Sequence, residues 1–222
     1  MTTPMAMQLI TAAVLTLASQ FLLASLFFSG VAWLLARPGI RGGGPRRRWR
    51  VAWTDAARTL WRAAPYVAVL GSAAAAVQWL VMHHAPLIVT QPGWFLALGA
   101  GSTGGSYVML NAGRREARGR LAAARRQVRL GGELAFLGMF AQLVLLWCPL
   151  IFETATRRAL LVESGIAGVI LLVGMICLFC AAFVAILAGL SGKPRPSAQF
   201  ATLIYLLGLL SVLASTQMAL GP

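Results

Sequence analysis

The side chains in this sequence that could bind a metal ion or transfer protons are few. The histidines are the adjacent residues His83 and His84, and Glu153 and Glu163 are expected on the same side of the folded chain. Imidazole and carboxylate groups together can hold Zn²⁺ or act as a general acid and base. Adjacent residues on a helix point about 100° apart, so these histidines are poor joint ligands there. A solvated histidine pair is therefore favoured, and no metal ion and no catalytic residue is predicted.

The cysteines offer little redox chemistry. Cys177 and Cys180 match the CxxC spacing, and Cys148 precedes Pro149. All three lie inside apolar runs, where cysteine packs as a small hydrophobic residue, and neither water nor a partner thiol is expected there. We interpret them as packing residues, and no cofactor is expected.

The most distinctive segment is 99–106, which reads Gly-Ala-Gly-Ser-Thr-Gly-Gly-Ser. Ala97, Gly101 and Gly105 are spaced four residues apart, so they share one helix face and allow a second helix to approach closely. This helix packing is the favoured interpretation. The segment lacks the lysine of a GxxxxGK[ST] phosphate-binding loop, and that interpretation is rejected.

An alternative interpretation is that these glycines loosen the helix near the middle of a membrane, where freed backbone groups can line a binding site. Ser102 and Thr103 would then face a cavity. Gln20 and Gln142 fall at a similar depth by residue counting, although glutamines at that depth usually form hydrogen bonds between helices. If the chain binds a substrate, we predict the site at these four residues.

Membrane-spanning helices must position these residues. The chain of 222 residues is 59% hydrophobic and 11% charged, whereas soluble domains average about 45–50% and about 25%. A helix crosses the hydrocarbon core of a bilayer with about 20 apolar residues. Six stretches without a central charge meet or approach that length, namely 8–36, 63–82, 90–111, 132–151, 164–190 and 199–220. We therefore expect an all-α, polytopic bundle of about six transmembrane helices in a single integral membrane domain, residues 1–222.

The basic residues gather between these stretches. Of the 19 lysines and arginines, eight lie within 37–62, seven within 114–129, and two are Lys193 and Arg195. All 17 of these residues face the cytoplasm if the N-terminus is outside, as the positive-inside rule requires. We therefore expect both termini outside the cytoplasm. Composition and compactness favour the inner membrane of a bacterium.

The basic segments 37–62 and 112–131 are expected to be cytoplasmic. In the first, tryptophans recur near helical spacing between Trp49 and Trp61 with arginines between them, which predicts a short amphipathic helix on the membrane surface before the second span. The second is predicted to be a helical extension of the third or fourth span, and its charge is interpreted first as a topology signal. The candidate residues for contact with lipid headgroups or partners are Arg46, Arg47, Arg50, Trp49, Trp53, Arg114, Arg115, Arg125 and Arg126.

No charged side chain is expected at the middle of the membrane, which argues against a proton-coupled pump, an intramembrane hydrolase and paired-histidine haem ligation. The leading hypothesis is a non-enzymatic multipass subunit of a larger inner-membrane complex, which docks partners through its basic loops. The alternatives are a small permease with an uncharged polar site near the midplane and, third, a membrane enzyme with an outer-face His/Glu site. Expected partners are a bilayer with anionic headgroups and other membrane or cytoplasmic subunits. Nucleic acid is not expected, because topology explains the positive charge.

Overall fold

The uncharged stretches of the sequence fold as helices, since a helix satisfies its backbone hydrogen bonds within one segment. The computed structural model describes residues 3–37, 45–81, 93–116, 118–152, 165–190 and 194–220. The helices are α1 (Thr3–Ala36), α2 (Pro45–Leu80), α3 (Gly93–Glu116), α4 (Leu121–Phe152), α6 (Ile166–Leu190) and α7 (Pro194–Leu220). No strand occurs within these ranges. The predicted all-α fold is confirmed.

Within the described part of the chain, four stretches of helix are long and apolar enough to cross a membrane, namely Met7–Ala36, Arg47–Leu80, Leu121–Leu145 and Ile166–Leu187. They belong to α1, α2, α4 and α6, and they show that the chain is a helical membrane protein. The apolar part of α7, Gln199–Ser215, is shorter. α3 has 24 residues and a large share of glycine, serine and threonine, which makes it less apolar. Both helices nevertheless lie within the same bundle.

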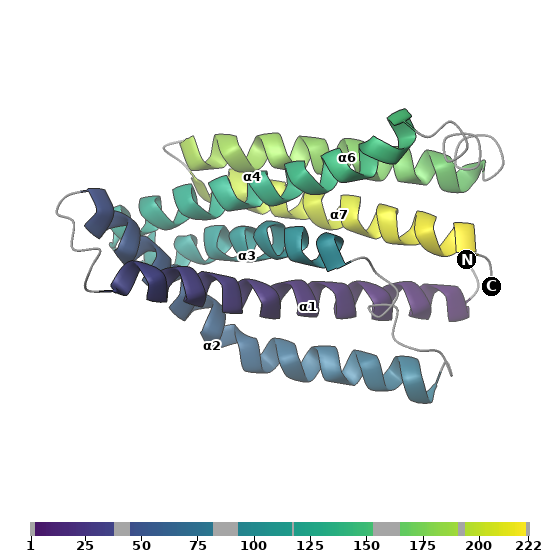
Figure 1. The fold of residues 1–222 in the computed structure, drawn as a ribbon, viewed down its shortest axis with the longest axis horizontal. Helices are drawn as coiled ribbons and strands as arrows, with labels where there is room; N and C mark the ends of the chain where they lie inside the picture. Colours follow the sequence, from purple (N-terminus) through teal and green to yellow (C-terminus); the bar gives the residue numbers. More distant parts are fainter. Residues whose placement is uncertain are drawn as a thin grey trace.

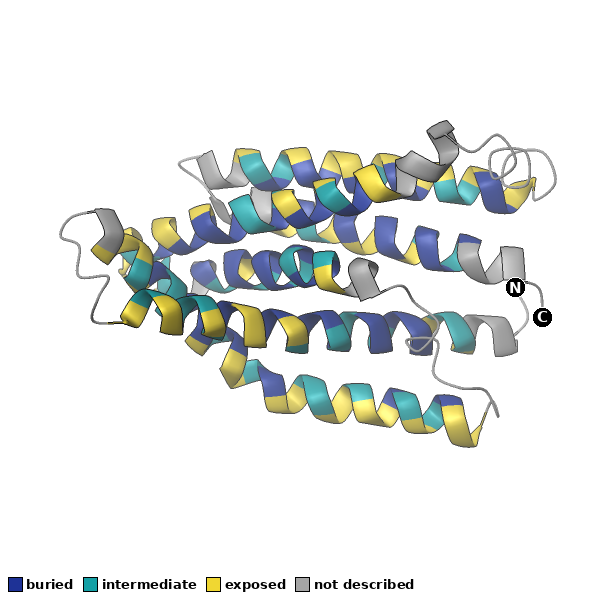
Figure 2. Ribbon diagram, in the orientation of Figure 1, coloured by how far each residue is buried: buried dark blue, intermediate teal, exposed yellow. Residues whose placement is uncertain are grey.

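Successive helices run antiparallel, and the two termini lie at the same end of the bundle (Figure 1). The main packed pairs are α1 with α2, α3 with α4, and α6 with α7. α3 also contacts α1, α2 and α7, so it occupies the centre. Buried residues follow the inner sides of the helices, whereas α2 and α6 present many exposed residues (Figure 2). Side chains on α3 are therefore placed to contact most of the other helices.

The prediction of a separate short surface helix before the second span is wrong. That segment is the first half of the 36-residue helix α2, which continues directly into the apolar half. Its apolar face packs against protein, because Ala52, Ala56 and Leu60 are buried in a cluster with residues of α1, α3 and α4. The alanines favour an uninterrupted helix. α2 contains Pro65 and changes direction about midway (Figure 1), as expected where a proline removes a helix hydrogen bond.

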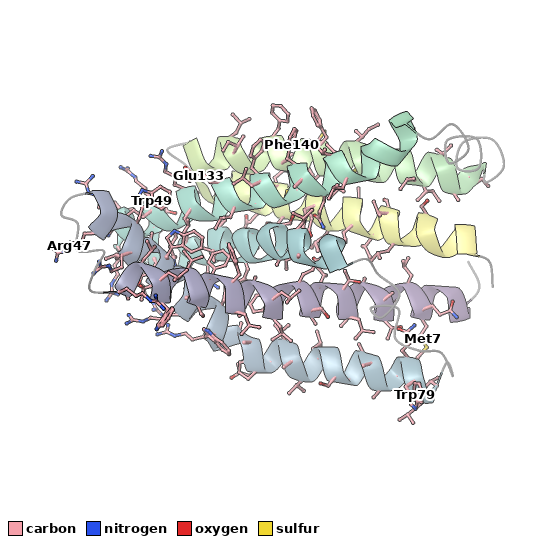
Figure 3. The ribbon with its side chains drawn as sticks, viewed as in Figure 1. Met7, Arg47, Trp49, Trp79, Glu133 and Phe140 are labelled. Atoms are coloured by element: carbon pink, nitrogen blue, oxygen red, sulfur yellow. The ribbon has the colours of Figure 1, made fainter. Side chains whose placement is uncertain are left out.

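The basic segment 112–131 is helical at both ends, as predicted. α3 continues to Glu116 and α4 begins at Leu121, with a turn that includes Gly119 at φ 73° between them. A positive φ is accessible to glycine at little energetic cost, which suits a tight reversal between two helices. The two extensions carry arginines to the end of the bundle where α2 begins (Figure 3).

Candidate functional site

Gln20, Ser102, Thr103 and Gln142, predicted to lie at a similar depth, are brought together in the structure. Ser102 Oγ donates a hydrogen bond to Gln142 Oε1 at 2.9 Å. Thr103 Oγ1 donates one to Gln20 Oε1 at 2.8 Å. Tyr205 joins them from α7, donating from its hydroxyl to Gln20 Oε1 at 3.3 Å and lying 3.3 Å from Thr103 Oγ1. We call these five residues the polar cluster; they link α1, α3, α4 and α7.

The polar cluster is almost sealed from the outside. Gln20, Ser102, Gln142 and Tyr205 are each exposed by at most 1%, and Thr103 is partly buried. A polar group without a partner in an apolar medium costs several kcal/mol, roughly 2–7. The hydrogen bonds inside the cluster offset that cost and also fix the relative depth of four helices.

Gly99 provides the space in which the two glutamine amides meet. A Cβ atom at this position would lie 2.0 Å from Gln20 Nε2 and 2.9 Å from Gln142 Nε2. Within the described residues, Gln20 Nε2 and Ser106 Oγ are buried without a hydrogen-bond partner. The Gln20 amide, which belongs to the cluster, therefore retains donor capacity that a water molecule or a small neutral polar ligand could use.

Tyr205 is the member of the polar cluster that sequence reasoning missed. It lies inside the predicted span 199–220. Tyrosine is enriched at the membrane–water boundaries, and Tyr205 is away from them. A tyrosine hydroxyl buried away from the interface needs a partner. This was the available signal, and its partners are the hydroxyl and amide groups of α3 and α1.

The predicted packing residues contact α4 unevenly. A Cβ atom on Gly105 would lie 2.5 Å from Ala135 N and 2.6 Å from the Gly131 carbonyl oxygen, so the two backbones are close there. A Cβ atom on Gly101 would lie 3.4 Å from the Leu134 carbonyl oxygen, which is an ordinary contact. Ala97, by contrast, is exposed and lines an apolar groove. Of the three predicted packing residues, Gly105 therefore lies closest to the α4 backbone.

The candidate docking residues gather at one end of the bundle, opposite Met7 and Trp79 (Figure 3). Arg47, Trp49, Arg125 and Arg126 are exposed there, and Arg50 is partly buried. The side chains of Arg46 and Arg114 lie outside the described residues.

Two of the candidate docking residues contact other parts of the protein. Arg115 forms an ion pair with Asp55 at 2.9 Å, linking α3 to α2. Trp53 packs against Phe27 and Phe28, with ring centroids 6.1 and 5.1 Å apart. These two side chains stabilise the fold at the basic end.

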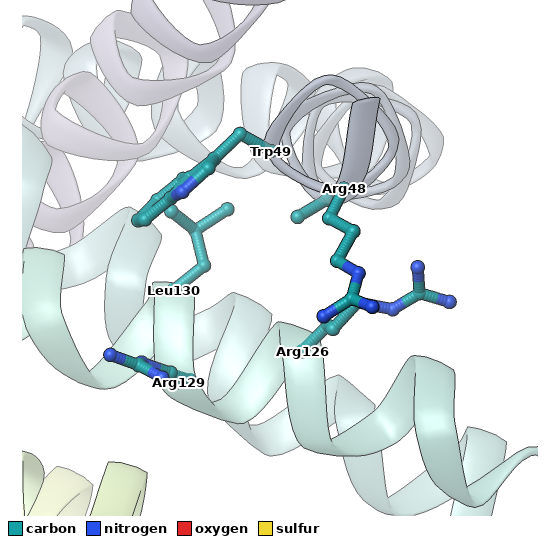
Figure 4. A pocket seen from close by; sticks show the side chains of 6 residues that line it. Arg48, Trp49, Arg126, Arg129 and Leu130 are labelled. Atoms are coloured by element: carbon teal, nitrogen blue, oxygen red, sulfur yellow. The ribbon is translucent and has the colours of Figure 1, made fainter. Parts of the chain in front are cut away.

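A cavity of about 310 Å³ lies between the beginnings of α2 and α4. Arg48 and Trp49 line it from α2, and Arg126, Arg129 and Leu130 line it from α4 (Figure 4). Because three of its lining side chains are arginines, it is suited to an anion with several acceptor oxygens.

Several sequence hypotheses concern positions outside the described residues: His83, His84, Glu153, Glu163 and the side chain of Cys148. Cys177 and Cys180 are free thiols on α6, the first partly buried and the second exposed. Among the described residues, no group of three or more histidine, cysteine, aspartate or glutamate side chains is arranged to hold a metal ion. Comparison with protein-family models, curated proteins and solved structures finds no match.

Proposed function

We propose that the chain is a non-enzymatic, multipass subunit of a larger complex in the inner membrane, and that it docks its partners through α2 and the basic end. The observation that carries this proposal is the exposure of the second half of α2, after Pro65. In the most apolar stretch of α2 only 17% of the residues are buried, whereas 33% to 56% are buried in the corresponding stretches of α1, α4 and α6. Among these four helices, the apolar stretch of α2 therefore has the largest share of residues available to another membrane helix.

The exposed face of α2 has the composition of a helix-packing surface. Ser72, Ala73 and Ala76 are exposed between the larger side chains of Val69 and Trp79. Small residues let two backbones approach closely in lipid, where packing drives association. Gly174 and Gly208 follow the same rule inside this protein, since a Cβ on Gly174 would lie 3.0 Å from the Gly208 carbonyl oxygen.

The basic end supports docking of an acidic partner. Two of its acids, Asp55 and Glu133, are already paired with Arg115 and Arg129 at 2.9 Å. Most other arginines described there are exposed. Complementary charge on a partner would speed association and fix its orientation.

Crosslinking in native membranes tests the proposal. A photoreactive benzoyl-phenylalanine at Ala73 or Ala76 should give an adduct of one defined mass with a different protein. The matched control is Val169, which is exposed on α6 and should give none. Absence of the Ala73 and Ala76 adducts, with the chain alone and monodisperse in mild detergent, would contradict the proposal. So would an adduct of two copies of this chain.

The permease is a second candidate because Gln20 Nε2 is buried in the polar cluster without a hydrogen-bond partner. Neither the cavity at the basic end nor the apolar groove is lined by Gln20, Ser102, Thr103 or Gln142. A permease would therefore have to open toward the cluster during transport. Replacing Ser102 by cysteine, with the three native cysteines removed, should then allow labelling by a water-soluble maleimide. Complete protection in membranes would leave the permease without a site.

A further inference from the structure

The cavity at the basic end has an unbalanced charge. Among the residues that the structure describes, Arg48, Arg126 and Arg129 line it and no aspartate or glutamate does. Arg129 Nε donates a hydrogen bond to Glu133 Oε1 at 2.9 Å. Arg126 Nε donates one to the Ala122 carbonyl oxygen at 3.2 Å. A guanidinium has five N–H donors, so each of these contacts occupies one of them. The arginines can still bind phosphate, whose oxygens suit the guanidinium fork.

A second cavity, the apolar groove, measures about 550 Å³ and lies between α1, α3 and α4. Bulky side chains form its walls, among them Phe27 on α1 and Leu137 on α4. α3 contributes the small residues Ala97, Ala100 and Gly101 to its lining, so the groove is recessed between its neighbours. Phe27, Ala97 and Leu137 are exposed, which places the opening on the outer surface of the bundle.

The two cavities lie along one face of α4. Arg126 and Leu130 line the first, and Leu134, Leu137 and Ala141 line the second. Their spacings of three or four residues put them in a single row on the helix. From Arg126 to Ala141 the row is about 22 Å long at 1.5 Å per residue. One leaflet, with half the hydrocarbon core and one headgroup layer, is about 20–22 Å thick.

We propose that this face of α4 binds one anionic phospholipid, with its phosphate among Arg48, Arg126 and Arg129 and an acyl chain in the apolar groove. The indole of Trp49 lies at the cavity, at the level where tryptophan favours headgroups. An acidic peptide would satisfy the arginines but would leave the apolar groove uncovered. The inference rests on the membrane location of the helices and does not depend on docking at the exposed second half of α2. It assigns the arginines that line the cavity to lipid and leaves the other exposed arginines of the basic end to an acidic partner.

The headgroup half is tested by native mass spectrometry of the purified, delipidated protein with dioleoyl phosphatidylglycerol or dioleoyl phosphatidylcholine. Phosphatidylglycerol should bind more tightly. Arg48→Gln and Arg126→Gln should each weaken that binding about fivefold, the effect of one basic residue at an anionic surface. Arg125→Gln is the matched control, because Arg125 is an exposed neighbour that does not line the cavity. It should change binding by less than about twofold.

The acyl-chain half is tested by filling the groove with Ala97→Phe. This change should weaken binding of dioleoyl phosphatidylglycerol. It should leave unchanged the concentration of inorganic phosphate that displaces half of the bound lipid, because phosphate competes only for the arginines. Ile176→Phe, on the exposed face of α6, is the control and should do neither. Equal binding of the two lipids, equal effects of Arg125→Gln and Arg126→Gln, or no effect of Ala97→Phe would overturn the proposal. Binding of a polyglutamate peptide in place of lipid by the same arginines would also overturn it.

Discussion

The amide groups of Gln20 and Gln142 are accommodated because Gly99 has no side chain. In Gly99→Ala the new methyl group would meet Gln20 Nε2 at 2.0 Å, so the glutamine would have to swing away from Thr103 and Tyr205. We expect a loss of stability of about 1–3 kcal/mol, the usual cost of overpacking. Reversible unfolding in mixed micelles would measure it. An unchanged midpoint would show that the amides are not held in this arrangement.

Thr103 and Gln20 offer a direct measurement of one bond in the polar cluster. The variants Thr103→Val and Gln20→Leu remove the two partners of the 2.8 Å hydrogen bond with little change in shape. A double-mutant cycle should give a coupling energy near 0.6 kcal/mol and at most about 1.7 kcal/mol, the range for hydrogen bonds between membrane helices. Additive effects of the two substitutions would mean that the bond does not stabilise the fold.

The backbones of α3 and α4 are in close contact at Gly105. A methyl group there would lie 2.5 Å from Ala135 N, and backbone atoms cannot rotate away as a side chain can. Gly105→Ala should therefore separate the two helices and cost about 3 kcal/mol or more. Gly30→Ala, with nothing within 4 Å of its added methyl group, is the control. It should be neutral or stabilise α1 by about 0.5–1 kcal/mol. Equal unfolding midpoints for the two variants would contradict this account of the interface.

The sequence predicted the positions of the helical elements and only part of their packing. Charge-free stretches identify helices because hydrocarbon excludes charge, and each described helix contains most of one such stretch, although α2 and α4 begin well before theirs, at Pro45 and Leu121. Four of these helices are long and apolar enough to span a membrane. Residue counting also grouped Gln20 with Gln142, since depth in a membrane follows position along a helix. Which face of α2 meets protein depends on tertiary contacts, so the burial of Ala52 and Ala56 against the bundle was missed. The same limit hid the cavity that Arg48 and Arg126 line together.

The arginines whose side chains are described gather at one end of the bundle, opposite the two termini (Figures 1 and 3). If that end faces the cytoplasm, fusions of alkaline phosphatase to either terminus should be active, and fusions of a fluorescent protein should be dark in an oxidising exterior. A fusion within the turn at Gly119 should give the opposite pair of results. Fluorescence from either terminal fusion would reverse the orientation.

The polar cluster also bears on how the chain is made. Gln20 lies in α1 and Tyr205 in α7. Most of the chain is therefore synthesised before the Tyr205 hydroxyl can donate its hydrogen bond to the Gln20 side chain. Until then its polar group must be sheltered by the insertion machinery or by Thr103. A nascent chain truncated before α7 should therefore be held longer by the insertase and degraded faster by membrane proteases than the complete chain. Entry of the Tyr205 hydroxyl into the bilayer would complete the hydrogen bonds of the polar cluster.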